Sequence, residues 1–165
     1  MNNFRQTANF IWEIADLLRG DYKQSDYGKV ILPFTVLRRL DCVLSPTKQK
    51  VLDYLPRLES TNVQNVDPIL NKVAKHNFHN RSKYDFELLV ADADHLAANL
   101  RNYINGFSEN AREIIEYFDF DKQIDRLEKA NLLYLVVKRF QEVDMHPDVM
   151  SNVEAGYLFE ELIRN

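Results

Sequence analysis

Apolar residues along this chain recur mainly at spacings of three and four, the period of a helix that buries one face. The first such pattern runs from Phe4 to Leu18 and predicts an amphipathic helix that ends at Gly20. Trp12 adjoins the apolar stripe of this helix. Because aromatic side chains often fill helix crossings, we expect Trp12 to pack in the core.

The strongest pattern lies between Ser25 and Leu44. Apolar residues there, Phe34 and Leu37 among them, cover almost the whole circumference of a helix, which predicts a position in the middle of a bundle. The polar residues that remain form a narrow stripe of Lys29, Arg38, Arg39 and Asp41. Ser25 or Asp26 is expected to cap the helix, and Ser45-Pro46 to open the next one. Pro33 lies inside the pattern and predicts a kink, because its ring crowds the preceding turn.

The rest of the chain also shows helical patterns, separated by short polar junctions. Further helices are expected from Pro46 with an interruption at Pro56, from Asp67-Pro68, from Asp92 or Asp94 to Gly106, from Ser108, from Asp119 or Asp121 to Phe140 with Asn131 as a break point, and from Ser151. Polar residues 59–67 predict a surface loop, and residues 146–148 a turn. Phe86 to Val90 is the one strand candidate. The expected fold class is all-α, a multi-helix orthogonal bundle with at most a short strand or hairpin, as one helical domain over residues 1–165.

Length and composition support a single ordinary core. The chain has 165 residues, of which 45% are hydrophobic, enough for one core and short for two. Its apolar runs fall short of the roughly 18 residues that span a bilayer, so we expect a soluble, untargeted protein without membrane partners. The single cysteine, Cys42, fits a reducing cytoplasm and is expected to be a small core residue.

Charge is unevenly distributed along the sequence. The formal net charge is -4, which argues against a general nucleic-acid coat but leaves room for local basic patches. Residues 71–84 contain four basic residues and no acidic one, interleaved with aromatic and histidine residues. The bases are Lys72, Lys75, Arg81 and Lys83. Residues 85–128, by contrast, contain eleven acidic and four basic residues.

A search for catalytic chemistry gives negative results. The four glycines are far apart, which excludes a glycine-rich phosphate loop. His76 and His79 have the spacing of a ligand pair but lack a second pair, so they make a poor zinc site. Asp119, Asp121 and Asp125 lack the glycine and the final glutamate of a calcium loop, and helix capping explains them better. We therefore predict no catalytic, cofactor-binding or metal residues in this chain.

Four blocks of the sequence together resemble the N-terminal helical domain of the methylase subunit of type I restriction-modification enzymes, called HsdM. The blocks are IWEIADLLRGDYKQSDYGKVILPFTVLRRLDCVL (11–44), DADHLAANLRNYINGF (92–107), FDFDKQIDRLEKANLLYLVVKRF (118–140) and DMHPDVMSNVEAGYLFEELIR (144–164). They occur in the right order and cover most of the chain, which makes the resemblance specific. The GYLFEELIR block resembles the segment that leads into the catalytic domain, so we expect the full protein to continue past Asn165.

The resemblance implies a role within a larger DNA adenine methyltransferase. In that family a later domain binds S-adenosylmethionine and carries an Asn-Pro-Pro-Phe type motif, and neither the cofactor motif nor the catalytic motif occurs here. The implied partners are the specificity subunit, the restriction subunit, a second methylase subunit and double-stranded DNA. The implied function is to help assembly and to enclose DNA. The candidate DNA contacts are Lys72, Lys75, Arg81 and Lys83, with Lys29, Arg38 and Arg39 as a second set that could instead pair with core carboxylates.

Two other functions remain open from the residues alone. The chain could be a self-contained helical protein-interaction adaptor with no DNA role. It could also be a small metal hydrolase that uses His76 and His79, which would require bound metal. A downstream reading frame with the cofactor and catalytic motifs would decide between the methylase subunit and the adaptor.

Overall fold

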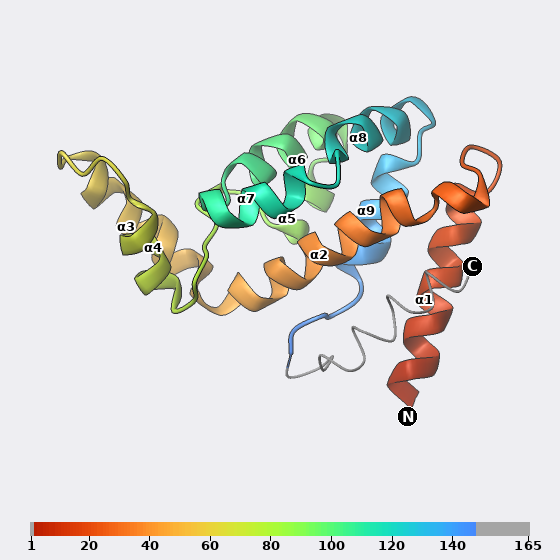
Figure 1. Cartoon of the computed structure of the whole chain (residues 1–165), viewed down its shortest axis with the longest axis horizontal. Helices are drawn as coiled ribbons and strands as arrows, with labels where there is room; N and C mark the ends of the chain where they lie inside the picture. The colour runs from red at the N-terminus through yellow and green to blue at the C-terminus, as the bar shows by residue number, and fades with distance from the viewer. Residues whose placement is uncertain (1, 148–165) are drawn as a thin grey trace.

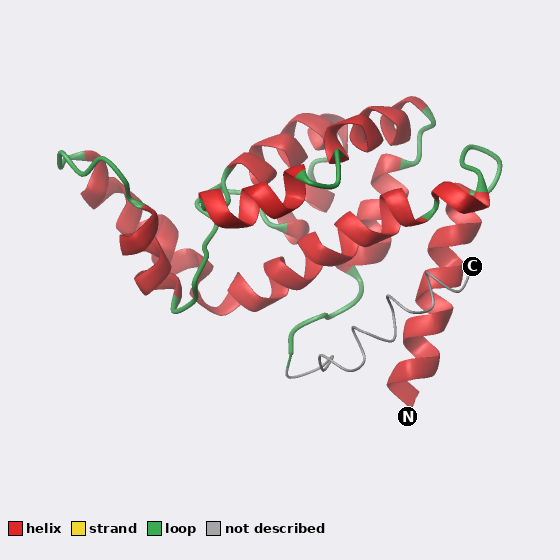
Figure 2. Cartoon of the chain, in the orientation of Figure 1, coloured by secondary structure: helices red, strands yellow, loops and turns green. Residues whose placement is uncertain are grey.

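The computed structural model describes residues 2–147, with side chains from residue 8 onward, and over this range every regular element is helical (Figures 1 and 2). The α-helices are α1 (Asn2–Leu18), α2 (Gly28–Leu44), α3 (Lys48–Glu59), α4 (Asp67–Ala74), α5 (Phe86–Ala91), α6 (Leu96–Asn105), α7 (Glu109–Glu116), α8 (Phe120–Lys129) and α9 (Leu133–Gln141). Short 3-10 turns η1 (Gln24–Asp26), η2 (Ser45–Thr47) and η3 (Ala93–His95) precede α2, α3 and α6. The all-α prediction is confirmed, while the helix expected from Ser151 lies outside the described residues.

Helix α2 is the centre of the bundle, as its circumferential apolar pattern predicted. It packs against α7, α8 and α9, and Figure 1 shows it running along the length of the molecule. Phe34 and Leu37 are fully buried, and the Phe34 ring meets Phe120 edge-on at 4.7 Å and stacks on Phe140 at 5.4 Å. Pro33 lies inside the helix and is itself buried. Packing on several sides therefore holds the proline in a position that an isolated helix would disfavour.

The start of α2 differs from the predicted cap. Ser25 and Asp26 belong to η1, and the N-cap residue is Tyr27, which offers no side-chain hydrogen bond. The backbone of η1 continues directly into the helix, because the carbonyl of Tyr27 accepts from the amides of Val30 and Ile31. The Tyr27 carbonyl, which follows the 3-10 turn, therefore accepts from amides of the first turn of α2, in place of the side-chain oxygen predicted to cap the helix.

A buried polar cluster fastens α2 to the far end of α9. Asp41 accepts from Nη1 of Arg38 at 3.0 Å and from the Tyr103 hydroxyl at 2.8 Å. Burial raises the pKa of the Asp41 carboxyl, although the hydrogen bond from Tyr103 lowers it in part. The same Arg38 guanidinium donates to the backbone oxygens of Val143 at 2.9 Å and Gln141 at 3.0 Å. One arginine therefore joins helices that lie about a hundred residues apart in the sequence.

Helices α3 and α4 pack against each other and form an arm at one end of the molecule, opposite α1 (Figure 1). Residues 60–66 connect them as the predicted surface loop. Pro56 lies inside α3 without ending it, so the predicted interruption is wrong. Val51, Leu58, Leu70 and Ala74 are the buried side chains of the two helices. We call residues 48–74 the arm.

The remaining sequence predictions on the fold had mixed outcomes. Residues 86–90 form α5 rather than a strand, because Asp85 caps them by accepting from the Leu88 amide at 2.9 Å. The long pattern after Asp119 breaks at Asn131, which takes a left-handed conformation with φ of 60° between α8 and α9.

Trp12 is 43% exposed, so its prediction as a core residue is wrong, whereas Cys42 is buried as expected. Within residues 2–147, no helix is both long and apolar enough to cross a bilayer.

Candidate nucleic-acid interface

The candidate interface is the basic segment, which we define as residues 72–83. It begins on the last turns of α4 and ends where the chain rejoins the body of the bundle. Lys75 ends α4 in a left-handed conformation with φ of 64°, and this turns the chain out of the helix. The segment is then tied to the turn between α6 and α7. The amide of Arg81 donates to the Gly106 carbonyl at 2.8 Å, and the amide of Ser108 donates to the His79 carbonyl at 2.9 Å.

Close approach to Gly106 makes this attachment possible. A Cβ atom at that position would lie 2.6 Å from the Ser82 Cβ and 2.7 Å from the Ser82 backbone nitrogen. Real Cβ atoms do not make contacts this short. The backbone of Gly106 has an ordinary φ of -79°, so the requirement for glycine here is one of space rather than of conformation.

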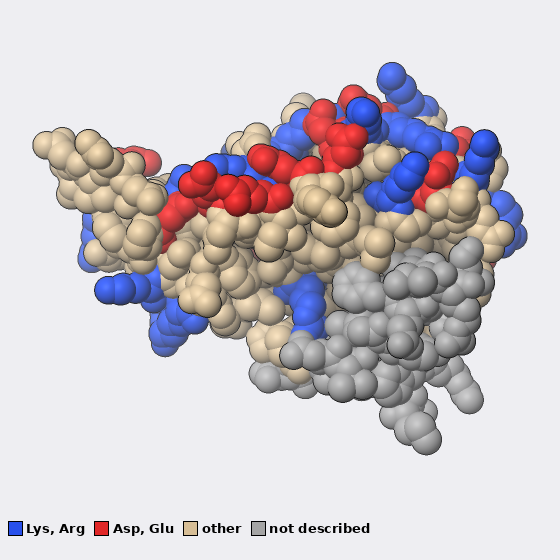
Figure 3. Space-filling model, in the orientation of Figure 1, with Lys and Arg blue, Asp and Glu red and all other residues tan. Residues whose placement is uncertain are grey.

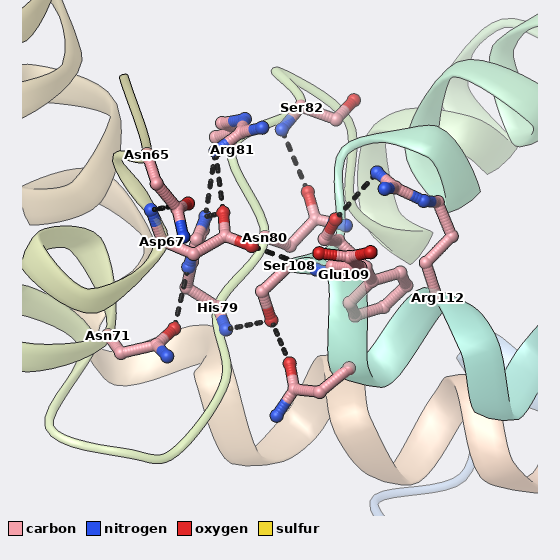
Figure 4. Close-up of polar contacts among 12 residues, drawn as sticks. Asn65, Asp67, Asn71, His79, Asn80, Arg81, Ser82, Ser108, Glu109 and Arg112 are labelled. Carbon is pink, nitrogen blue, oxygen red and sulfur yellow. Dashed lines mark hydrogen bonds and ion pairs between the residues drawn. The ribbon is translucent and has the colours of Figure 1, made fainter. Parts of the chain in front are cut away.

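Asn80 is the polar centre of the attachment (Figure 4). Its side chain is almost fully buried, and its amide nitrogen donates to the Tyr103 carbonyl at 2.8 Å. Its amide oxygen accepts from the Ser82 amide and from the Lys48 ammonium, each at 2.8 Å. Both ends of the amide are therefore satisfied, as a buried polar group requires.

Lys48 links the arm to the same centre. Its Nζ also donates to the Tyr84 carbonyl at 2.9 Å and lies 5.4 Å from the centre of the Tyr103 ring. Burial lowers the pKa of Lys48 to about 8, although Asp41 and Asp85 act in the opposite direction. The ammonium is therefore bonded within the structure at a half-buried position.

Asp67 connects three pieces of chain, as Figure 4 shows. One carboxylate oxygen accepts from Nη1 of Arg81 at 2.9 Å, and the other accepts from the backbone amide of Glu109 at 3.0 Å. The helix expected from Asp67-Pro68 does begin at Asp67, but Asp67 does not cap it, because the N-cap residue of α4 is Val66, without a side-chain hydrogen bond. The carboxylate serves instead the first turn of α7, where a negative charge is favoured.

His79 is buried beside this carboxylate. Its Nδ1 lies 2.8 Å from Oδ1 of Asn71, and the Asn71 amide nitrogen donates to the Asn77 carbonyl, which identifies Oδ1 as an acceptor. Nδ1 therefore carries the proton, and Nε2 can accept from Arg81 at 3.5 Å. Desolvation lowers the pKa of His79 to about 4, although nearby Asp67 raises it in part. The ring is consequently neutral near pH 7 and acts as a structural hydrogen-bonding group.

The lysines of the basic segment lie outside this network. Lys72, Lys75 and Lys83 are exposed, and within residues 8–147 none of them has a carboxylate at ion-pair distance. Lys83 lies over the Tyr84 ring at 5.1 Å. In Figure 3, basic side chains gather at the corner where α4 ends, while acidic side chains form a band over α7. Arg81 differs from the lysines because Asp67 holds its guanidinium at a half-buried position.

The second candidate set lies elsewhere, on α2. Lys29 is exposed and pairs with Asp26 at 3.1 Å. Arg38 pairs with the buried carboxylate of Asp41. For Arg38, the structure therefore has the alternative given in the sequence analysis, an ion pair with a core carboxylate. Nη1 of Arg39 donates to the Met145 carbonyl at 3.0 Å. The structure therefore does not bring these residues together with the basic segment.

The histidine pair does not form a metal-ligand group in this arrangement. His79 is buried and bonded to Asn71, whereas His76 is exposed and lies 5.8 Å, ring to ring, from Phe78. The described residues contain no group of three or more histidine, cysteine or acidic side chains placed to hold a metal ion.

Comparison with known proteins identifies the family. The model of one protein family, the HsdM N-terminal domain, matches residues 7–140. The chain belongs to this family. Searches of curated proteins and of solved structures each gave no significant match. The family match covers α2, the arm, the basic segment and the helices that hold it.

As an HsdM N-terminal domain, the chain is part of a methylase subunit of type I restriction-modification systems. Its basic segment offers three exposed ammonium groups on a backbone fixed by buried hydrogen bonds. Such groups suit contacts with phosphate oxygens, because the phosphates of a duplex attract positive charge whatever its base sequence. Asp67, Asn71, Asn80, Gly106 and Ser108, which hold the segment, were not predicted as site residues. Asp67 and Ser108 were predicted only as residues that start helices. In the structure their side chains accept from the amides of Glu109 and His79, which lie far away in the sequence.

Proposed function

We propose that this domain assists assembly of a type I methylase complex with its specificity subunit and helps to enclose double-stranded DNA, with Lys72, Lys75 and Lys83 facing the phosphate backbone. Methyl transfer from S-adenosylmethionine then belongs to a separate part of the methylase subunit. The restriction subunit and a second methylase subunit complete the proposed assembly. Its compartment would be the cytoplasm, which suits a free, buried Cys42.

One observation carries the DNA part of this proposal. The three lysines are exposed and without ion pairs to described residues, while the segment that carries them is anchored by the buried Asn80 and His79. Exposed cations on a fixed backbone lose little conformational freedom of the main chain on binding. An acidic chain can approach a polyanion only through such a local basic surface.

The test replaces the three lysines by glutamine in the full-length methylase assembly. Each lost phosphate contact should reduce the slope of log affinity against log salt by about 0.9, so the triple variant should lose up to roughly 2.7 in slope. Specific and non-specific duplexes should weaken alike, because phosphate contacts carry no base information. Binding of S-adenosylmethionine to the assembly should be unchanged.

A matched control replaces Lys23, Lys129 and Lys138 by glutamine, which removes the same charge from exposed positions that also have no ion pair to the described residues. This control should keep the parental slope. Equal slopes for the parent and the test variant would remove the basic segment from the DNA surface, and Lys29, Arg38 and Arg39 would then become the candidates. Arg81→Gln is measured separately, because its loss also breaks the ion pair with Asp67.

The self-contained adaptor, which binds only protein partners, makes a different prediction. For an adaptor, neither triple variant should alter DNA affinity at any salt concentration. The buried attachment of the basic segment is compatible with either function, so the salt slope is the measurement that separates them.

A further inference from the structure

The outward side of α7 carries a row of glutamates, part of the acidic band in Figure 3. Glu109, Glu113 and Glu116 are exposed at spacings of four and three residues, so the row follows one side of the helix for about 10 Å. Within the described part of the chain, no base pairs with the carboxylate of Glu109 or Glu113. Glu116 has Arg112 at 4.0 Å, the outer limit of an ion pair, and that guanidinium also donates to backbone carbonyls of the turn before α7.

This glutamate row is unfavourable for the isolated helix. Like charges three and four residues apart on a helix repel one another. The last turn of α7 has no basic residue, although the helix dipole favours positive charge there, and Glu113 and Glu116 lie in that half of the helix. Glu109, in the first turn, is the member of the row whose charge suits its end of the helix. Positive charge supplied by a partner would therefore relieve repulsion that the domain itself leaves uncompensated.

Two large apolar side chains lie beside the glutamate row. Tyr117 is 88% exposed, and Ile114, three residues before it, is 55% exposed. Residues three or four apart are neighbours on a helix surface, so Tyr117 adjoins both Ile114 and Glu113. Tyrosine is among the residues that most often dominate binding energy at protein interfaces, since it offers a large rigid surface at low entropic cost. The outward side of α7 thus combines uncompensated negative charge with an apolar patch.

From these features we infer that the α7 face, defined as Glu109, Glu113, Ile114, Glu116 and Tyr117, docks a basic amphipathic segment of a different protein subunit. Lysine or arginine side chains of that segment pair with the glutamate row, and its apolar side chains cover the patch. Such side chains can bury their stems while the charged head stays in polar surroundings. The phosphates of DNA would be repelled by the row, and the basic segment of a second copy of this chain is assigned to DNA above.

The first experiment removes the two carboxylates that lack a base, by Glu109→Gln with Glu113→Gln in the full-length methylase subunit. Association with the purified specificity and restriction subunits, a choice that rests on the proposed function, is measured without DNA by mass photometry. The variant should bind one of these subunits roughly 2- to 30-fold more weakly at low salt, the range for two exposed ion pairs. Its difference from the parent should shrink as the salt concentration rises.

The matched control is Glu59→Gln with Glu128→Gln. It removes the same charge from exposed positions on α3 and α8, where no described residue forms an ion pair with either carboxylate, and it should bind like the parent. Thermal unfolding of Glu113→Gln alone separates docking from a structural role. Because that change removes repulsion within the helix, the variant should melt at or above the parental temperature. A lower melting temperature would assign the carboxylate to the fold and overturn the inference.

The second experiment concerns Tyr117. Benzoylphenylalanine at this position should give, on irradiation, a crosslink to one peptide with at least two basic residues in the subunit whose affinity fell. A crosslink to DNA, to a second copy of this chain or to an acidic peptide, or no crosslink at all, would overturn the inference. Tyr117→Ala should weaken binding of that subunit at least about 30-fold, as expected for a dominant interface residue, while it melts like the parent.

These measurements also separate the α7 face from the proposed function. Parental affinity of the glutamine variant or of Tyr117→Ala would overturn the α7 face alone. A parent that binds neither subunit would overturn the proposed assembly together with it. The DNA part of the proposal depends on other residues and on the salt slope, so its failure would leave a docking result obtained without DNA unchanged.

Discussion

Replacing Gly106 by alanine tests whether the basic segment is held as described. The added Cβ would lie 2.6 Å from one Ser82 atom and 2.7 Å from the Ser82 backbone, so the segment must move by several tenths of an ångström or more. Overpacking of this kind typically costs about 1 to 3 kcal/mol. Movement also weakens the hydrogen bond from the Arg81 amide to Gly106, which contributes about 1 kcal/mol. Reduced backbone entropy of the unfolded chain offsets about 0.5 to 1 kcal/mol.

The expected net loss is about 1 to 3.5 kcal/mol in the free energy of unfolding, a substantial part of the stability of an ordinary domain. For a chain of this length, it corresponds to a melting temperature lower by about 2 to 14 °C. The assay is thermal or urea unfolding followed by circular dichroism. Amide hydrogen exchange supplies a local readout, because Arg81 and Ser108 should lose protection before the amides of α2.

Gly28→Ala provides the matched control. A Cβ there meets only the Leu32 Cδ1 at 3.8 Å, which is ordinary contact, and the position is the first residue of α2. The control should be neutral or more stable by up to about 1 kcal/mol, because alanine favours helix. If Gly106→Ala unfolds at the same temperature as Gly28→Ala and keeps protection at Arg81, the close approach does not constrain the segment.

The remaining predictions concern the core, the buried histidine and the cofactor. Phe34→Ala and Leu37→Ala should each lower the free energy of unfolding by about 2 to 5 kcal/mol, and melts equal to the parent would contradict a central α2. His79 has a folded pKa of about 4 against an ordinary 6.5, so its contribution to stability is complete above pH 6.5 and is lost as the pH falls toward 4. His79→Gln should flatten that part of the stability profile, and an unchanged profile would contradict the burial argument. Calorimetric titration of the isolated chain with S-adenosylmethionine should show no binding, and a micromolar affinity would refute this expectation.

Local patterns predicted the helices well but could not predict the polar attachment. Helix α2 was recognisable because apolar residues around almost its whole circumference favour a central position. The helical state of Phe86 to Val90 was missed because a short apolar run fits either structure, although Asp85 was a readable cap. The bond between Asp67 and Glu109 joins residues 42 positions apart, and no local spacing predicts it. The outward lysines at 72, 75 and 83 were predictable as a basic run, but only the fold distinguishes them from Arg81.

The hydrogen bonds from Arg38 to the backbone of Gln141 and Val143 have a consequence for the order in which the domain folds during its synthesis. The acceptor at Val143 lies 105 residues further along the chain, and the Phe140 ring that stacks on Phe34 is equally distant. At typical translation rates of about 5 to 20 residues per second, these partners emerge roughly 5 to 20 s after Arg38. Until then α2 exposes apolar faces that only the later helices can cover. A ribosome-bound chain stalled before Val143 should therefore retain chaperones, and one stalled well beyond it should release them.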